Sequence, residues 1–573
     1  MVFKSGRFPF FGVDTTIDKF QRYFFRSFRG GIATPSIKLF TPLVAEAGFK
    51  SGFAMFDLQG EPTKYFKTRT PYTELFLAIG QGKEQFFRLI HTQNISRTWN
   101  AALSIDRITS DGMYLRQNAV FNSINLTSNF LSKNNRYSFL LKGTYCVFKR
   151  DENGGIKNDS AFMENELGNR KLIGINLAEA RTRTGVRSIA MEHFFYIGKP
   201  SENSRDTAEK KIIVPASYFS YTFSYADEWH VYDDKNPQEG YYINVLRDTL
   251  RTLDSTFVSG IYNRLRWRRL GKHVSGGVSY LNSIHDIRNK YLPDSTMTNH
   301  IVSTELNSSR SNRLQFDFLA EYIANGPLKG DYGISTYIGN VRCLKGRGRV
   351  SFKLKHAYRS AEYLYTKYAS NHFEWVNEFE KLSETEAQLT FYNERGFVAI
   401  KAYSVFNFIY FDTAFLPVQH EKRITIGSVG GKMRVFRLRN IVLDAEIWLQ
   451  KPASSDSIIR LPLIYSDVSM FYEDYWFKKA SEVQVGIDLL WYSPFYSDAY
   501  MPALRAYYQQ QERQTGGYPY IDFFFNMKIR YARLFFKVEN VTAGLFGYDY
   551  FSARHYPSYD RIFKFGVSMK FWD

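Results

Sequence analysis

Three arginines occupy alternate positions in the segment FVSGIYNRLRWRR, residues 257–269. Side chains two residues apart on a β-strand share a face, so Arg264, Arg266 and Arg268 would form one row of positive charge on a strand. A row of guanidinium groups on the wall of a pore favours anions electrostatically. The same spacing gives two further candidate pore-lining rows: Arg349, Lys353 and Lys355 in residues 348–358, and Lys528 and Arg530 in residues 520–531.

Two other roles for these cations stay open. They can pair with acidic groups such as Asp488, Asp522 and Glu539, and pairing would cancel much of their field. They can also lie near the rim of a barrel and hold the phosphates of lipopolysaccharide, since Arg and Lys both bind phosphate. Only cations that line the pore wall without acidic partners predict anion selectivity.

Catalytic and metal chemistry find little support in the sequence. His91 and His356 lie in strand-like segments and His285 lies in a turn-like one, and none has a partner at metal-ligand spacing. Cys146 and Cys343 are far apart in sequence, a pattern of neither a disulfide framework nor a metal site, so we expect two unpaired thiols. We therefore expect no enzyme activity, no metal and no cofactor. A hydrolase whose site residues converge only in three dimensions stays an open alternative.

The elements that would position the charged rows are long, two-faced strands. In residues 520–531 the apolar Ile521, Phe523, Phe525, Met527 and Ile529 alternate with the polar positions. Similar segments of ten or more residues recur along the chain, which is the length that a tilted strand needs to cross a bilayer. Tight turns at 132–136 and 393–396 are interspersed with long loops at 151–171, 233–240 and 496–518. We predict an all-β fold, an antiparallel transmembrane β-barrel over residues 71–573 with an even strand number near 20, between 16 and 22.

Residues 1–70 alternate poorly, and we predict a pre-barrel segment on the periplasmic side or in the lumen. The first twenty residues lack the uninterrupted apolar core of a secretory signal. Because the alternation indicates export, we expect that the signal has been removed from this sequence.

The composition of the chain argues against three other classes of protein. The formal net charge is +19, and 17% of the residues are aromatic, with 41 Tyr and 51 Phe. No run of 18 apolar residues predicts a transmembrane helix. A basic chain with interleaved aromatics can bind nucleic acid, but no recognisable module is present and the cations sit at alternate strand positions. A soluble sandwich or propeller would also alternate, but no repeat period or propeller signature is found, and the apolar faces are strongly aromatic.

The last predicted strand has one apolar face, and it ends the sequence, so no later residues can cover that face. Phe563, Phe565, Val567, Met569 and Phe571 alternate to the C-terminus. In a closed barrel this strand pairs with the first one and shows that face to lipid. The stretch KFGVSMKF, residues 564–571, also resembles the terminal recognition pattern of outer-membrane proteins. The residues at its defined positions are Lys564, Gly566, Met569 and Phe571. This resemblance implies recognition by the barrel-assembly machinery.

Longer stretches resemble a known family. Residues 70–96, SKNNRYSF (132–139), DENGGIKND (151–159), 496–541 and FSARHYP (551–557) are similar to the putative porins of Bacteroidota outer membranes, and the similarity covers roughly residues 20–573. It implies an integral β-barrel of the outer membrane of a Gram-negative bacterium. Its implied partners are outer-membrane lipid, lipopolysaccharide, the assembly machinery and other outer-membrane proteins. The resemblance carries no substrate and no site residue to this chain.

The function we expect is passive diffusion of small polar solutes, anions among them. The alternative is a structural or accessory barrel subunit of a larger outer-membrane assembly, with a blocked lumen. A third class, an active transporter gated by an N-terminal plug, needs more than the 70 residues that precede the predicted barrel.

Overall fold

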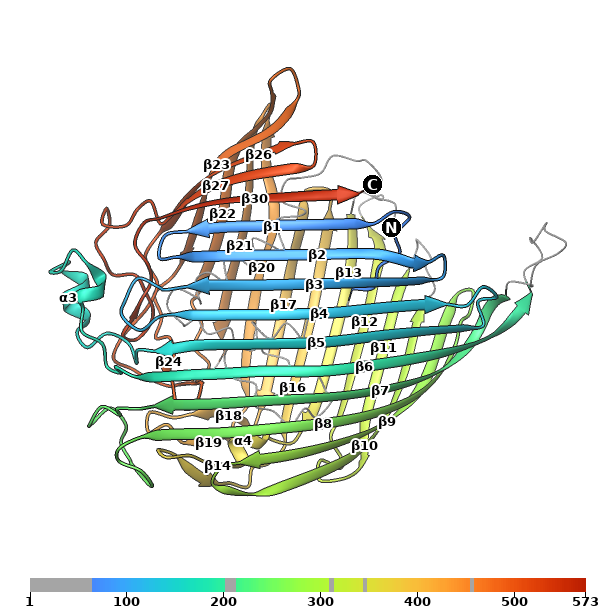
Figure 1. Cartoon of the computed structure of the whole chain (residues 1–573), viewed down its shortest axis with the longest axis horizontal. Helices are drawn as coiled ribbons and strands as arrows, with labels where there is room; N and C mark the ends of the chain where they lie inside the picture. The colour runs from blue at the N-terminus through green and yellow to red at the C-terminus, as the bar shows by residue number, and fades with distance from the viewer. Residues whose placement is uncertain (1–63, 201–212, 309–313, 344–347, 454–457, 573) are drawn as a thin grey trace.

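The alternating segments form a closed antiparallel barrel of 22 strands in the computed structural model (Figure 1). The structure describes residues 64–572 except 201–212, 309–313, 344–347 and 454–457. The barrel strands are β1 Tyr72–Gly80, β2 Glu84–Ser96, β3 Trp99–Ser110, β4 Ala119–Leu131, β5 Tyr137–Glu152, β6 Ala180–Pro200, β7 Ile213–Asp234, β8 Thr252–Arg269, β9 Val274–Asn289, β10 Leu292–Ser308, β11 Gln315–Asn325, β12 Tyr332–Cys343, β13 Gly348–Arg359, β16 Leu382–Asn393, β17 Gly396–Phe406, β20 Ile424–Leu438, β21 Ile441–Pro452, β22 Ile464–Trp476, β23 Ser481–Tyr492, β26 Tyr520–Ile529, β27 Ala532–Glu539 and β30 Ile562–Trp572.

The barrel closes between its first and last strands. β1 pairs with β30 in antiparallel register from Tyr72 opposite Trp572 to Gly80 opposite Lys564, and every other strand pairs with its neighbours along the chain. Closure leaves no free edge, so the backbone groups of every strand find partners within the sheet. The fold class predicted from alternation is confirmed, and the strand number is even and inside the predicted range.

The two ends of the barrel differ in the length of the connections between strands. At one end, here called the turn end, the strands are joined by short turns at residues 97–98, 132–136, 270–273, 394–395, 439–440, 477–480 and 530–531. At the other end, the loop end, the longer connections are residues 111–118, 153–179, 235–251, 360–381, 407–423, 493–519 and 540–561. Short turns on one side and long loops on the other are typical of outer-membrane barrels.

The tight turns form where Asn side chains satisfy the turning backbone. The side-chain oxygen of Asn393 accepts hydrogen bonds from the backbone N–H of Arg395 and of Gly396, and Asn135 has a positive φ in the turn at 132–136. Asn tolerates both arrangements better than most residues, which fixes the register of the flanking strands. Both turns lie where the sequence predicts them.

The long loops contain small elements of their own. Their strands are β14 Lys367–Ala369, β15 Glu374–Val376, β18 Phe408–Phe411, β19 Pro417–His420, β24 Ala499–Met501, β25 Ala506–Tyr508, β28 Phe551–Ala553 and β29 Tyr556–Pro557, and their short α-helices are α3 Asp159–Met163 and α4 Tyr363–Thr366. No helix in the described part of the chain is both long and apolar enough to cross a membrane.

The residues of each strand alternate between an apolar outer face and a mixed inner face. On β30, Phe563, Phe565 and Phe571 are about half exposed on the outside, and Lys564 and Ser568 between them are buried inside the barrel. The apolar face of the last strand is therefore the outer surface of the barrel, which is where a bilayer would meet it.

The segment before β1 touches the inner wall. The backbone oxygens of Lys64 and Thr68 accept hydrogen bonds from the side chains of Thr127 and Asn94, which lie on the inner faces of β4 and β2. Residues 1–63, most of the predicted pre-barrel segment, lie outside the described residues. The division of the chain at residue 70 stays a prediction.

Candidate functional site: the barrel interior and its loop cap

The three alternating arginines of β8 lie on the inner face. Arg264 stands opposite Thr222 of β7 and Leu281 of β9, and Leu281 belongs to a buried cluster inside the barrel. Leu265 and Trp267, between the arginines in sequence, are exposed on the outer face. Arg266 and Arg268 follow Arg264 toward the turn end, so the three form one inner row.

The other predicted cations divide between the wall and a turn. Arg349, Lys353 and Lys355 share the inner face of β13, because Phe352 between them is exposed outside. Lys528 lies inside on β26. Arg530 differs from the prediction, because β26 ends at Ile529 and the chain reverses there, which leaves Arg530 exposed in the turn with a φ of 50°.

Carboxylates stand close to several cations of the wall. Arg268 pairs with Glu305 of β10 at 3.3 Å, and Lys353 pairs with Glu386 of β16 at 3.6 Å. Lys528 pairs with Glu482 of β23 at 3.1 Å. The inner wall thus carries both positive and negative side chains, and these ion pairs contribute little net electric field.

The acidic residues proposed from sequence as partners also pair, but with other cations. Lys537 of β27 lies 3.0 Å from Asp522 and 3.7 Å from Asp488, and Lys564 lies 2.9 Å from Glu539. Among the described residues no ion pair joins Arg264 or Arg266. Arg349 likewise forms no ion pair with a described residue, and its guanidinium donates a hydrogen bond to Asn340 at 2.9 Å.

At the loop end, loop residues pack against the inner wall in a layer that we call the loop cap. Its first part joins β1–β4 to two distant loops. Phe76, Phe86 and Phe121 on the inner faces are buried against Tyr500 from residues 493–519 and Tyr556 from residues 540–561. Aromatic side chains of this size each bury a large apolar area, so the contact holds the two loops inside the barrel mouth.

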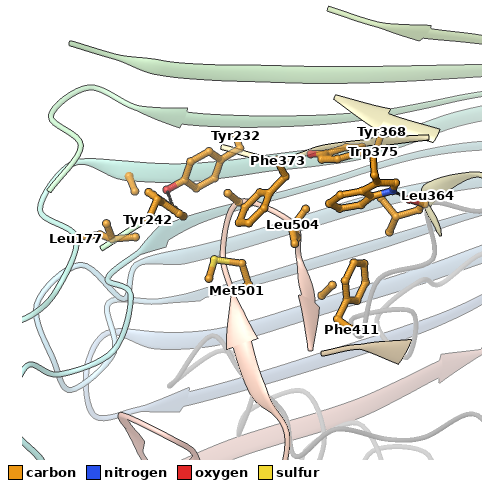
Figure 2. Close-up of a cluster of buried hydrophobic side chains, with 13 residues drawn as sticks. Leu177, Tyr232, Tyr242, Leu364, Tyr368, Phe373, Trp375, Phe411, Met501 and Leu504 are labelled. Carbon is orange, nitrogen blue, oxygen red and sulfur yellow. Dashed lines mark hydrogen bonds between the residues drawn. The ribbon is translucent and has the colours of Figure 1, made fainter. Parts of the chain in front are cut away.

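The second part of the cap is a larger apolar cluster assembled from five connections (Figure 2). Figure 2 shows Phe373 and Trp375 beside Leu504, with Met501 and Phe411 below them. The buried members of the cluster are Leu177, Ala180, Tyr232, Tyr242, Leu364, Tyr368, Phe373, Trp375, Phe411, Met501, Ala503, Leu504 and Ala506.

The hairpin of β24 and β25 connects these two parts. Its residue Tyr500 packs in the first cluster, and Met501 and Leu504 pack in the second. β25 also pairs in parallel with β18, with Tyr508 opposite Phe411. Continuous packing therefore runs from the wall formed by β1–β4, across the loop end, to the loops at 360–381 and 407–423.

Buried polar contacts fix the loops of the cap to one another. The side-chain oxygen of Asn371 accepts hydrogen bonds from the backbone N–H of Arg247 and of Asp248, and its amide nitrogen donates to Thr252. The neighbouring His372 stacks on Tyr242 with ring centroids 3.8 Å apart. Desolvation lowers the pKa of His372, so the ring is neutral in the folded cap.

Buried arginines join the cap to the barrel wall and two of its loops to each other. Arg150, on the inner face of β5, pairs with Glu152 and donates to the hydroxyl of Tyr500. Arg170 pairs with Asp560 at 2.8 Å and lies over the ring of Phe162. Both arginines are almost fully buried, and a buried charge is tolerated only when it is paired in this way.

One buried carboxylate of the cap, that of Asp498, has few groups that stabilise its negative charge. Asp498 precedes β24, and its Oδ1 atom is buried without a hydrogen-bond partner, 3.9 Å from the guanidinium of Arg460. Burial raises the pKa of Asp498 to about 7. The carboxyl group therefore titrates near neutral pH while the cap is folded.

Sequence reasoning missed the cap because loop residues have no periodicity to reveal burial. The available signal was composition, since residues 496–508, YSDAYMPALRAYY, contain four Tyr, a Met and a Leu in a stretch predicted as part of a long loop. Large apolar side chains in a long loop are buried in the folded state more often than they are exposed.

The residues of the terminal recognition pattern divide between the two faces of β30. Met569 and Phe571 point outward, whereas Lys564 and Gly566 face inward. A side chain at Gly566 would overlap the ring of Phe535 on β27, so close packing inside the barrel requires glycine there. Their role in barrel assembly stays a prediction.

Other chemistry is sparse in the described residues. No group of three His, Cys, Asp or Glu side chains in that part of the chain is arranged to hold a metal ion. Cys146 and Cys343 do not form a disulfide bond with each other, as the sequence predicts.

An antiparallel barrel with an apolar outer face and a charged interior is the architecture of proteins that cross membranes with strands. The profile of a family described as putative porins matches residues 12–573. The chain belongs to this family. No curated protein matches the chain in sequence.

Solved structures share the fold at low identity. A ferric enterobactin receptor mutant from Pseudomonas aeruginosa superposes with a TM-score of 0.61 at 8% identity, over 88% of this chain and 82% of that one. The FrpB iron transporter from Neisseria meningitidis superposes with a TM-score of 0.59 at 10% identity, over 88% and 82%. At these identities the likeness concerns the fold alone.

Proposed function

We propose that this chain is an outer-membrane barrel whose loop cap closes its interior at rest, and that small polar solutes pass when the cap is displaced. The observation that carries the proposal is the packing of the β24–β25 hairpin in the barrel mouth. Tyr500 packs in the cluster on β1–β4, and Met501 and Leu504 pack in the second cluster with residues of the other loops. This differs from the open diffusion pore expected from sequence, and it is supported by the packing of loop residues against the inner wall and one another at the barrel mouth. The receptor and the transporter that share the fold support a transport role only by analogy.

The energy of the packing argues for a closed resting state. Exposing a buried Leu, Met or Phe side chain to water costs about 1.5–3 kcal/mol. Moving the hairpin would expose Met501, Leu504 and Phe411 together with parts of Phe373 and Trp375. A cost of about 6 kcal/mol would leave the open form populated at less than about one in ten thousand. A ligand or a partner that binds the open form would then be needed to shift the equilibrium.

The interior supports passage of polar rather than apolar solutes. Its wall carries both charges, and the paired residues impose little selectivity between them. Arg264 and Arg266 supply the local positive charge from which we infer a mild preference for anions. A Bacteroidota source, implied by the sequence resemblance, stays a prediction.

Single-channel recording in a planar bilayer under a KCl gradient tests the proposal. The wild type should be nearly silent, and Met501→Asp with Leu504→Asp should conduct steadily, because two buried charges disrupt the apolar layer. Leu250→Asp, at an 82% exposed position of another loop, is the matched control and should stay silent. Heat-modifiable gel mobility verifies that each barrel is folded.

A second function is favoured by exposed aliphatic side chains in two loops of the loop end. Ile243, Leu250 and Val376 are each more than two-thirds exposed, and their loops are joined by the ion pair of Arg247 with Glu374. Exposed aliphatic side chains that gather on a surface mark protein contacts. An accessory subunit of a larger assembly should therefore co-purify with a partner in mild detergent. A folded hairpin variant that stays silent would favour this second function over the first.

A further inference from the structure

The turn end of the barrel carries an excess of positive charge. The seven turns named above contain nine Lys or Arg and one acidic residue, Glu394, and each turn has at least one cation. The loop end is balanced by comparison. Residues 153–179 hold three cations and four acids, residues 360–381 hold two and four, and residues 540–561 hold two of each. The asymmetry is therefore a property of one end of the barrel.

Four cations in neighbouring turns of this end form no ion pair with another described residue. Arg439, Lys478, Lys479 and Arg530 lie in three successive turns, are exposed, and form no ion pair with a described residue. Loop-end cations such as Arg170, by contrast, pair with acids of other loops. Like charges held close together repel, so an external anion that binds near several of them stabilises the arrangement.

The charge is spread around the rim rather than gathered in a patch. Adjacent turns are separated by two strands, about 10 Å, so the cations of the seven turns named above lie on a ring that follows the circumference of the barrel. A folded acidic protein would contact one sector of such a ring. A layer of anionic groups that surrounds the barrel would contact all of it.

Outward-facing aromatic side chains lie beside this ring. Trp99, Phe195, Phe219, Trp267, Trp476 and Phe571 are all exposed on the outer face close to the turn end. Aromatic girdles mark the level of the lipid headgroups in membrane barrels. Flexible Lys and Arg side chains just beyond a girdle reach the phosphates of that layer.

We propose that the turn end is a binding surface for anionic phospholipids, whose phosphates are held by the ring of turn cations. The surface anchors that end of the barrel in its leaflet, and it does so whether or not solutes pass through the interior. The proposal therefore depends on membrane insertion but not on the opening of the loop cap.

Lipid binding to the full-length protein tests the proposal. Detergent-solubilised protein is titrated with phosphatidylglycerol or phosphatidylcholine, and bound lipids are counted by native mass spectrometry. Wild type should retain phosphatidylglycerol severalfold more strongly, and the preference should decline with added salt. The variant Arg439→Gln, Lys478→Gln, Lys479→Gln and Arg530→Gln should bind phosphatidylglycerol about tenfold more weakly, with phosphatidylcholine unchanged.

The matched control removes the same charge from the loop end, by Lys157→Gln, Lys171→Gln, Lys235→Gln and Lys422→Gln. This control should bind both lipids like the wild type, and glycerol phosphate at the lipid concentration should displace neither lipid. Equal retention of the two lipids by wild type would overturn the proposal. So would an unchanged preference in the turn-end variant, as expected if the ring faces an acidic protein, or complete displacement by glycerol phosphate.

Discussion

Tyr508 of β25 pairs in parallel register with Phe411 of β18, which joins the loop at 493–519 to the loop at 407–423 inside the barrel mouth. Phe415 of the second loop packs edge-on against Tyr508 with ring centroids 4.5 Å apart. The pairing extends a sheet of four short strands across the loop end. This relationship makes the cap a folded layer rather than a set of independent loops.

Removing a side chain at the centre of the cap should loosen it without unfolding the barrel. Phe411 is buried against Trp375 and Tyr365, so Phe411→Ala should cost about 3–5 kcal/mol of local stability. Hydrogen exchange of residues 499–508 should accelerate, whereas exchange in the barrel strands should not. Leu416→Ala, at an exposed position of the same loop, is the control. Equal exchange in both variants would show that the cluster does not hold the hairpin.

Cap stability should depend on pH through Asp498. Its pKa is about 7 in the folded cap against an ordinary value of 3.8, so between these values the folded state keeps a proton that the unfolded loop releases. The contribution of Asp498 to cap stability should therefore be greatest below pH 4, fall by about 2–4 kcal/mol as pH rises to 7, and then level off.

Asp498→Asn should abolish this dependence. Hydrogen exchange of residues 499–508 at pH 5 and pH 8, divided at each pH by the intrinsic exchange rate of an unstructured chain, measures the effect in both proteins. A wild-type cap that exchanges equally at the two pH values would refute the role of this carboxyl group.

Gly566 should be required for the packing of the closing strands. Gly566→Ala places a methyl group into the ring of Phe535, and overpacking of this kind costs about 1–3 kcal/mol. The urea concentration at which half of the barrel is unfolded, measured by heat-modifiable gel mobility, should fall. Phe535→Ala in the same chain should restore part of the loss. Gly427→Ala on β20, where a Cβ meets open space, is the control and should have little effect.

The charge preference of the interior should respond to Arg264 and Arg266. In the hairpin variant that conducts, Arg264→Gln with Arg266→Gln should move the reversal potential under a KCl gradient toward potassium. Arg269→Gln removes one charge from the outer face of the same strand and should leave the reversal potential unchanged. An identical shift in both variants would mean that the inner row does not set selectivity.

The barrel could be predicted from sequence because its strands obey a single rule. Alternation with a period of two places Phe565 outside and Lys564 inside whatever the rest of the chain does. The same rule placed Arg264, Arg266, Lys353 and Lys355 on the inner face. It misplaced Arg530, because the position at which a strand ends depends on the turn and not on the alternation.

The cap could not be predicted in the same way. Tyr500 and Met501 are adjacent in sequence and pack in different clusters, and their partners lie more than ninety positions away in most cases. Burial of that kind depends on which loops meet in space, and no local pattern encodes it. The pairing of Arg268 with Glu305 was likewise invisible, since it requires the register of two neighbouring hairpins.

Single-channel recording of the wild-type protein beside its Met501→Asp, Leu504→Asp variant is the most direct test of closure by the loop cap. The structure predicts a wild-type barrel that is folded and nearly silent, and a variant that conducts steadily. Steady conductance of the wild type at the level of the variant would contradict a closed resting state.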